Sequence, residues 1–129
     1  MKRICIYGKG GIGKSTTAAN VAAALADQGL RTALIGCDPK ADSTRCLTGR
    51  RISTIIQMSN EGVPEKALET GYKGILCIES GGPEPGTGCA GRGIASAIHA
   101  VNEHKLIDDR DVAIFDVLGD VVCGGFSTP

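Results

Sequence analysis

The chain has 129 residues and a formal net charge of zero, a length typical of one domain or of part of one. The neutral charge gives no sign of a nucleic-acid-binding or membrane-binding surface, and no apolar run approaches the length of a membrane span. Aromatic residues make up only 3%, so we expect an aliphatic core. The basic N-terminal stretch is too short for a signal-peptide core, and we expect a soluble, cytoplasmic protein.

Apolar runs that favour strands alternate with segments of helical periodicity. We expect strands at 3–7, 31–36, 74–79 and 112–117, helices at 15–28 and about 94–104, and a weakly patterned connector at 50–71 with a short helix near 64–70. The strands are nearly continuous apolar runs, which is typical of parallel sheets covered on both faces. This pattern predicts a doubly wound α/β fold. Residues 1–129 would form a single domain, and the end of the chain in a loop suggests the N-terminal part of a longer protein.

A glycine-rich stretch, GKGGIGKST at 8–16, follows the first predicted strand and opens the first predicted helix. It matches the phosphate-loop pattern G-x-x-x-x-G-K-[ST] and predicts a P-loop NTPase, although a glycine-rich turn that binds nothing is the alternative. Its backbone N–H groups and the helix N-terminus would face phosphate oxygens. Lys14 would neutralise the β- and γ-phosphates, and the Ser15 hydroxyl would ligate Mg²⁺. The predicted nucleotide-binding residues are Gly8, Lys9, Gly10, Gly11, Ile12, Gly13, Lys14, Ser15 and Thr16.

Lys9 directly follows the first glycine of this loop. A plain phosphate loop has no need of a lysine there, and this deviant form resembles that of ATPases that work as face-to-face dimers. In those proteins the early lysine reaches the nucleotide of the partner subunit. A solvated lysine is the alternative interpretation.

Two further loops are candidates for sensing the γ-phosphate. The strand VAIFD ends in Asp116, which is typical of a Walker B strand and would hold Mg²⁺ directly or through water. The N–H of Gly119 would meet the γ-phosphate, and Asp120 follows it. In the loop DPKADST, Asp38 and Asp42 offer carboxylates for Mg²⁺ or for positioning water. A simple Asp-Pro turn with a helix cap at Ser43 is the alternative. The predicted catalytic residues are Lys9, Asp38, Asp42, Asp116 and Asp120.

Six cysteines are present, and in a reducing cytosol they do not indicate a disulfide framework. Cys5, Cys37 and Cys77 adjoin apolar runs and are expected to be small buried side chains, with Cys46 also structural. Cys89 and Cys123 instead adjoin glycines in predicted loops. Two thiolates from each half of a homodimer would supply the four that a 4Fe-4S cluster takes. A zinc site shared across a dimer and two unrelated loop cysteines remain alternatives.

Four stretches together resemble the nitrogenase iron protein family: GKGGIGKSTT, GCDPKADST, ESGGPEPGTGCAGRG and DVLGDVVCGGF. The resemblance implies a homodimer that binds one bridging 4Fe-4S cluster and MgATP. It implies that electrons pass from a low-potential donor, such as ferredoxin or flavodoxin, to a larger catalytic nitrogenase component, gated by ATP hydrolysis. It also implies that Cys89 and Cys123 ligate the cluster. Arg92 would match the arginine of the docking face, which is ADP-ribosylated in some members.

Differences within the resemblance leave the partner open. DPKADST and GCAGRG separate the chain from the related subunits of the dark-operating chlorophyll pathway, which read DPKHDST and GCGGY. The connector at about 47–73 is shorter than is typical of nitrogenase iron proteins. A nitrogenase-like reductase that serves nickel-tetrapyrrole reduction is therefore an alternative. An alternative of another class is a non-redox dimeric P-loop ATPase that acts as a scaffold or positioning protein.

Overall fold

The computed structural model describes residues 1–9, 11–82 and 90–118, with backbone alone for 90–93. The strands are β1 (Lys2–Gly8), β2 (Thr32–Cys37), β3 (Glu69–Thr70), β4 (Leu76–Glu79) and β5 (Val112–Leu118). They form one sheet in the order β1-β5-β2-β4-β3, in which only β3 runs antiparallel to its neighbour. The four predicted strands are confirmed. β3 was not predicted, because its two residues are too few to show an alternating pattern.

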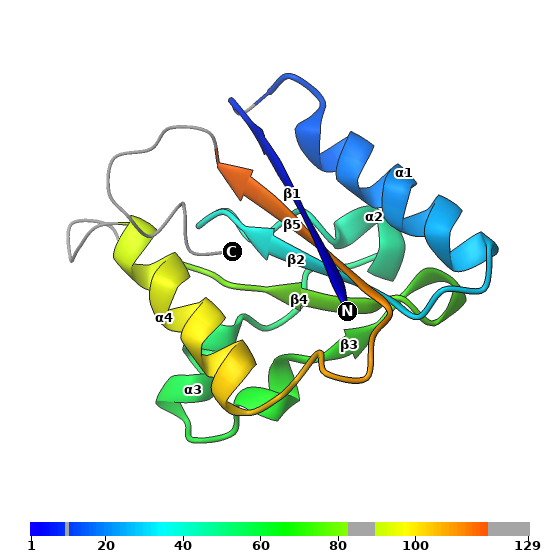
Figure 1. Cartoon of the computed structure of the whole chain (residues 1–129). Coiled ribbons are helices and arrows are strands. Elements are labelled where there is room, and N and C mark those ends of the chain that lie inside the picture. Colours follow the sequence, from blue (N-terminus) through cyan, green and yellow to red (C-terminus); the bar gives the residue numbers. More distant parts are fainter. Residues whose placement is uncertain (10, 83–89, 119–129) are drawn as a thin grey trace.

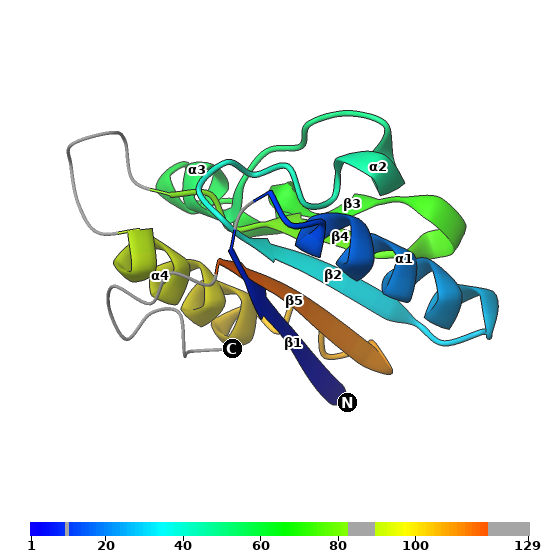
Figure 2. The same cartoon turned by 90° about the horizontal axis from the view of Figure 1, so that it is seen from above.

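Helices cover both faces of the sheet, as the continuous apolar strands predict (Figures 1 and 2). The helical segments are α1 (Lys14–Asp27), α2 (Arg45–Thr48), α3 (Ile55–Asn60), α4 (Ala90–Glu103) and the short 3₁₀ turns η1 (Pro64–Ala67) and η2 (Tyr72–Gly74). The small residues Ala18 and Ala22 of α1 pack against Leu34 and Ile114 on one face. On the other face, α4 and α3 pack against the opposite side chains of the same strands. In the described part of the chain, no helix has the length and apolar character needed to cross a membrane.

Two predicted helix boundaries were wrong. α4 begins at Ala90, so the glycine-rich sequence at 91–93 lies in its first turn rather than in a loop. Glycine disfavours a helix by about 1 kcal/mol per residue, but tertiary packing outweighs this cost, because Ile94, Ala97, Ile98 and Val101 are all buried. In the connector, the predicted helix near 64–70 is only the turn η1, and residues 69–70 form β3.

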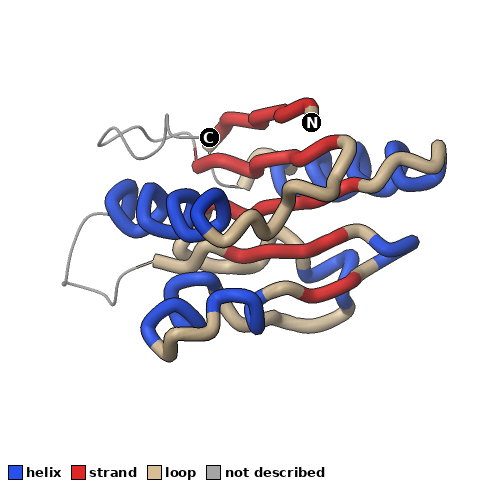
Figure 3. The backbone as a smooth tube through the Cα atoms, turned by 60° about the horizontal axis from the view of Figure 1, so that its bottom comes forward, coloured by secondary structure: helices blue, strands red, loops and turns tan. Residues whose placement is uncertain are grey.

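The parallel arrangement places the carboxyl ends of β1, β2, β4 and β5 at one edge of the sheet, whose strands lie side by side in Figure 3. Ligand sites in doubly wound α/β proteins lie at this edge. The phosphate loop leaves β1 here and the loop 38–44 leaves β2 here. The chain leaving β4, residues 80–82, starts at the same edge, and we call this segment the β4 exit.

Candidate functional site

The phosphate loop joins β1 to α1, and two of its described residues lie in the left-handed backbone region. Gly11 has a φ of 79° and Gly13 a φ of 90°, a conformation that glycine adopts without a steric cost. Gly13 is the N-cap residue of α1 and provides no side-chain cap, and no acidic residue lies in the first turn. The N–H groups at the start of α1 therefore remain available to an anion.

Lys14, Ser15 and Asp116 meet at the start of α1, although the aspartate lies 102 positions beyond the lysine. Lys14 Nζ donates a hydrogen bond to Oδ1 of Asp116, and the Ser15 hydroxyl donates to Oδ2 at 2.7 Å. The side chain of Lys14 is 6% exposed and that of Asp116 is fully buried. The register of β5 between β1 and β2 positions the aspartate, because Asp116 pairs with Ile6 and Gly36.

These three side chains offer the chemistry that a magnesium nucleotide requires. A serine hydroxyl and a carboxylate are the hard oxygen ligands that Mg²⁺ prefers. Both oxygens of Asp116 are directed at the first turn of α1 through its bonds to Lys14 and Ser15. A magnesium ion bound by the Ser15 hydroxyl would thus have a buried carboxylate beside it.

A cavity of about 250 Å³ lies over the phosphate loop. Its lining residues come from that loop and from the loop 38–44: Lys9, Gly11, Gly13, Lys14, Ser15, Thr16, Asp38, Lys40 and Asp42. The structure therefore brings together most of the predicted nucleotide-binding residues and two of the predicted catalytic aspartates. The three lysines suit phosphate oxygens, and the two carboxylates suit a metal ion or a water molecule. We call this space the phosphate-loop cavity.

The loop 38–44 begins as a compact turn. Oδ1 of Asp38 accepts a hydrogen bond from the backbone N–H of Lys40 at 2.9 Å, and the carbonyl of Asp38 accepts from Ala41 at 3.0 Å. The Asp-Pro turn considered from the sequence is therefore present. The helix cap at Ser43 is not, since the N-cap residue of α2 is Thr44 and its side chain does not cap the helix. The turn leaves Asp38 and Asp42 on the wall of the phosphate-loop cavity.

Thr44 instead binds Glu79, a residue that the sequence analysis missed. Glu79 ends β4 and is fully buried. Its Oε1 accepts from the N–H of Thr44 at 2.7 Å and from the Thr44 hydroxyl at 2.8 Å, whereas Oε2 has no hydrogen-bond partner among the described residues. Burial raises the pKa of Glu79 to about 7. The available signal was a lone carboxylate closing the apolar run GILCIE.

Several predicted site residues lie outside the described part of the chain: Gly10, Cys89, Gly119, Asp120 and Cys123. The backbone of Arg92 lies in the first turn of α4, and its side chain is also outside the description. The cluster ligands and the arginine of the docking face therefore stay predictions.

The cysteines within the described residues are free thiols. Cys37 and Cys77 are fully buried, as expected, and Cys5 is half-buried. Burial raises the pKa of Cys37 strongly and that of Cys77 to about 12, which keeps both thiols protonated at neutral pH. Cys46 is exposed, contrary to the expected structural role.

Comparison with protein families gives a match along almost the whole chain. The model of 4Fe-4S iron sulfur cluster binding proteins of the NifH/frxC family matches residues 2–129. A nitrogenase iron protein of Methanococcus voltae is 50% identical over 136 residues, which covers all of this chain and 49% of that protein. The chain thus spans about half the length of this curated relative.

Solved structures with the same fold include an enzyme with a bound ATP analogue. A cobyrinic acid a,c-diamide synthase from Mycobacterium smegmatis, with a bound ATP analogue and magnesium, is 26% identical with a TM-score of 0.69 and covers 99% of this chain and 55% of that one. The BceF tyrosine kinase domain has a TM-score of 0.69 at 22% identity, covering 97% of this chain and 49% of that one. The fold is therefore that of a P-loop NTPase, and the chain belongs to the NifH/frxC family of 4Fe-4S iron sulfur cluster binding proteins.

Proposed function

We propose that the protein is an ATP-dependent electron-transfer reductase. It would work as a homodimer with one 4Fe-4S cluster between the subunits and deliver electrons to a larger catalytic component of nitrogenase type. The observation that carries the proposal is the family match over residues 2–129. The joining of Lys14 and Ser15 to Asp116 at the phosphate loop supports its nucleotide-dependent part.

In the proposed mechanism, lysines and carboxylates around the phosphate-loop cavity would bind MgATP and promote its hydrolysis. Lys14 would move from Asp116 to the β- and γ-phosphates, and Ser15 with Asp116 would hold Mg²⁺. Asp38 and Asp42, which line the phosphate-loop cavity, would position the attacking water. Lys9 lines the same cavity and would neutralise phosphate charge on its own nucleotide or on that of the partner subunit.

The cluster end would use Cys89 and Cys123 of each subunit, which together give four thiolates. A bound cluster would supply the one-electron carrier. Cys37 and Cys77 are poor candidates for ligands, because burial raises the pKa of both thiols. Cys123 follows Asp116 by seven residues. A shift of segment 116–120, with Gly119 and Asp120 near the γ-phosphate, would therefore reach the cysteine over a short length of chain. Arg92 would lie on the docking face and contribute to partner recognition.

Anaerobic purification with metal analysis tests this function. We expect a brown dimer with about four irons per two chains. Cys89→Ser and Cys123→Ser should each lose the iron and the colour. Cys46→Ser is the matched control, because Cys46 is exposed and stands outside the proposed ligand set, and it should keep both.

The alternatives give different results in the same experiment. A non-redox positioning ATPase would hydrolyse ATP and dimerise without iron, and a shared zinc site would give zinc in its place. An iron-loaded dimer would leave the acceptor to be identified. Electron delivery to a nitrogenase component would support the proposal, whereas delivery only to a tetrapyrrole reductase component would support the nitrogenase-like alternative.

A further inference from the structure

Glu79 links two segments that the proposed function treats separately. It ends β4, ten residues before Cys89 in the chain. Its carboxylate holds both the backbone N–H and the hydroxyl of Thr44, at the base of the loop 38–44. Hydrogen bonds to a buried carboxyl group are stronger than those at the surface. The base of a loop that lines the phosphate-loop cavity is thus tied to the strand that leads toward a proposed cluster ligand.

The sheet register leaves space for this link. Glu79 and Asp116 both pair with Gly36, so these three residues form one row across β4, β2 and β5. A Cβ atom on Gly36 would lie 2.0 Å from Oε2 of Glu79 and 2.8 Å from Cβ of Ser43. Only glycine at this position lets the carboxyl group cross β2 and reach the loop.

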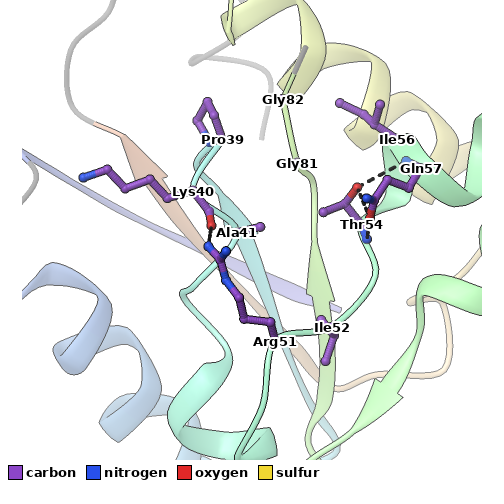
Figure 4. A pocket seen from close by; sticks show the side chains of 10 residues that line it. All are labelled: Pro39, Lys40, Ala41, Arg51, Ile52, Thr54, Ile56, Gln57, Gly81 and Gly82. Carbon is purple, nitrogen blue, oxygen red and sulfur yellow. Dashed lines mark hydrogen bonds between the residues drawn. The ribbon is translucent and has the colours of Figure 1, made fainter. Parts of the chain in front are cut away.

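The β4 exit packs directly against the same loop and against the start of α3 (Figure 4). A Cβ atom on Gly82 would lie 2.7 Å from Cβ of Pro39, and one on Gly81 would lie 2.7 Å from the Thr54 side chain. The carbonyl of Ser80 accepts a hydrogen bond from the N–H of Ile56 at 3.2 Å. Because the exit is packed this closely, a movement of the loop would also displace the backbone of the exit.

The tip of the loop has open space on two sides. Lys40 lines the phosphate-loop cavity on one side and, on the other, a cavity of about 450 Å³ between the loop, residues 51–57 and the β4 exit (Figure 4). Arg51 donates a hydrogen bond to the Lys40 carbonyl across this second space. Ala41 has a φ of 52°, outside the usual range for a residue with a side chain. Thr44 lies three residues after Ala41 in the same short loop, so a rearrangement of the tip would also displace Thr44 and the carboxyl group that holds it.

We propose that Glu79 is a positioning residue that transmits rearrangement of the loop 38–44 to the β4 exit, and hence toward Cys89. The inference rests on the proposed function, since MgATP in the phosphate-loop cavity would be the signal. It adds a route through β4 to the route through segment 116–120. Glu79 does not line the phosphate-loop cavity, so its part is to couple the two segments and not to bind nucleotide.

Hydrogen–deuterium exchange of the purified protein, with and without MgATP, tests the link. In the wild type, MgATP should change exchange both in the loop 38–44 and in the β4 exit. Glu79→Leu removes the acceptor and should weaken the response of the exit, while the loop response and MgATP affinity remain. Glu79→Gln keeps an amide oxygen for Thr44 and should restore the response of the exit. A merely structural role would alter exchange equally with and without MgATP.

Thr44 provides a second pair of variants in case Glu79→Leu does not fold. Thr44→Val removes the hydroxyl donor and should weaken the response of the exit, whereas Thr44→Ser keeps the donor and the response. Failure of the wild type to bind MgATP would overturn the proposed function, and the inference with it. Binding with a loop response but no exit response, or an unchanged exit response in Glu79→Leu or Thr44→Val, would overturn the inference alone.

Discussion

Two buried carboxylates, Asp116 and Glu79, flank Gly36 in one row of the sheet. Strand spacing puts residues two strands apart at roughly 10 Å, and both side chains are fully buried. Asp116 has a cationic partner, Lys14, and a hydroxyl donor, Ser15. Glu79 has only the two donors of Thr44, and its second oxygen has none among the described residues.

The difference shows what each carboxylate can do. A buried carboxylate with a lysine partner can exchange that partner for a metal ion, and the released lysine can bind a phosphate group. This pairing suits Asp116 to a binding site. Burial without a cationic partner raises the pKa of a carboxyl group. Such a group is suited to accepting hydrogen bonds from neutral donors and less suited to binding a metal ion. Glu79 therefore connects parts of the structure, whereas Asp116 takes part in the proposed nucleotide chemistry.

Removal of the aspartate should have the largest effect. Asp116→Ala leaves the buried ammonium group of Lys14 without its partner, and breaking a buried pair in this way costs about 3–5 kcal/mol. We expect a fall of this size in the free energy of unfolding, measured by urea denaturation. Asp111→Ala is the control: it breaks the exposed pair with Arg31 and should cost no more than about 1 kcal/mol. Equal losses in the two variants would contradict the contrast.

The pH dependence of the unfolding free energy should reveal the raised pKa of Glu79. The folded protein holds the proton of Glu79 up to about pH 7, whereas the ordinary pKa of this group is 4.5. Stability due to this group is therefore complete below pH 4.5 and is lost as the pH rises to 7, by roughly 3 kcal/mol. The difference in unfolding free energy between wild type and Glu79→Gln, measured from pH 4 to 8, should change by that amount in favour of the variant. A constant difference would show that burial does not raise this pKa.

Gly36→Ala should disturb the row between the two carboxylates. The new methyl group would overlap with Oε2 of Glu79 and with Ser43, and overpacking of this kind costs about 1–3 kcal/mol. Calorimetry should show a lower melting temperature. The double variant Gly36→Ala, Glu79→Ala should lose less stability than the two single variants together, because the second change removes one of the overlapping groups. Full additivity would argue against contact at this point.

The smallest expected effect lies beside the β4 exit. Thr54 caps α3 through a reciprocal pair of bonds: its hydroxyl accepts from the N–H of Gln57 at 3.2 Å, and its N–H donates to Oε1 of Gln57 at 3.0 Å. Thr54→Ala should cost about 1 kcal/mol. Thr54→Ser keeps the cap and should cost much less, and a loss as large as that of the alanine variant would point to methyl packing on Gly81 instead.

The sequence predicted the Asp116 side of the site much better than the Glu79 side. The phosphate loop has a short local pattern, and the apolar strand ending in Asp116 has another, so both could be found without knowing which strands pair. Glu79 depends on the register that aligns it with Gly36 and on its contact with Thr44 across 35 positions, and no local pattern shows this.

The connector contains a local sequence signal for the start of α3, a helix that was not predicted. Thr54 and Gln57 have the spacing of a capping box, which marks the start of α3. The two-residue strand β3 could not be found in this way, since its residues Glu69 and Thr70 are defined only by pairing with Cys77 and Leu76. The early start of α4 likewise reflects packing that overrides the poor helix propensity of glycine.

Electron paramagnetic resonance of the reduced, anaerobically purified protein is the most direct test of the central claim, that a shared cluster responds to bound nucleotide. We expect the signal of a reduced 4Fe-4S cluster whose shape changes on addition of MgATP but not of Mg²⁺ alone, and we expect Asp116→Asn to keep the signal and lose the change. Absence of a cluster signal, or a signal that MgATP leaves unaltered in the wild type, would contradict the account.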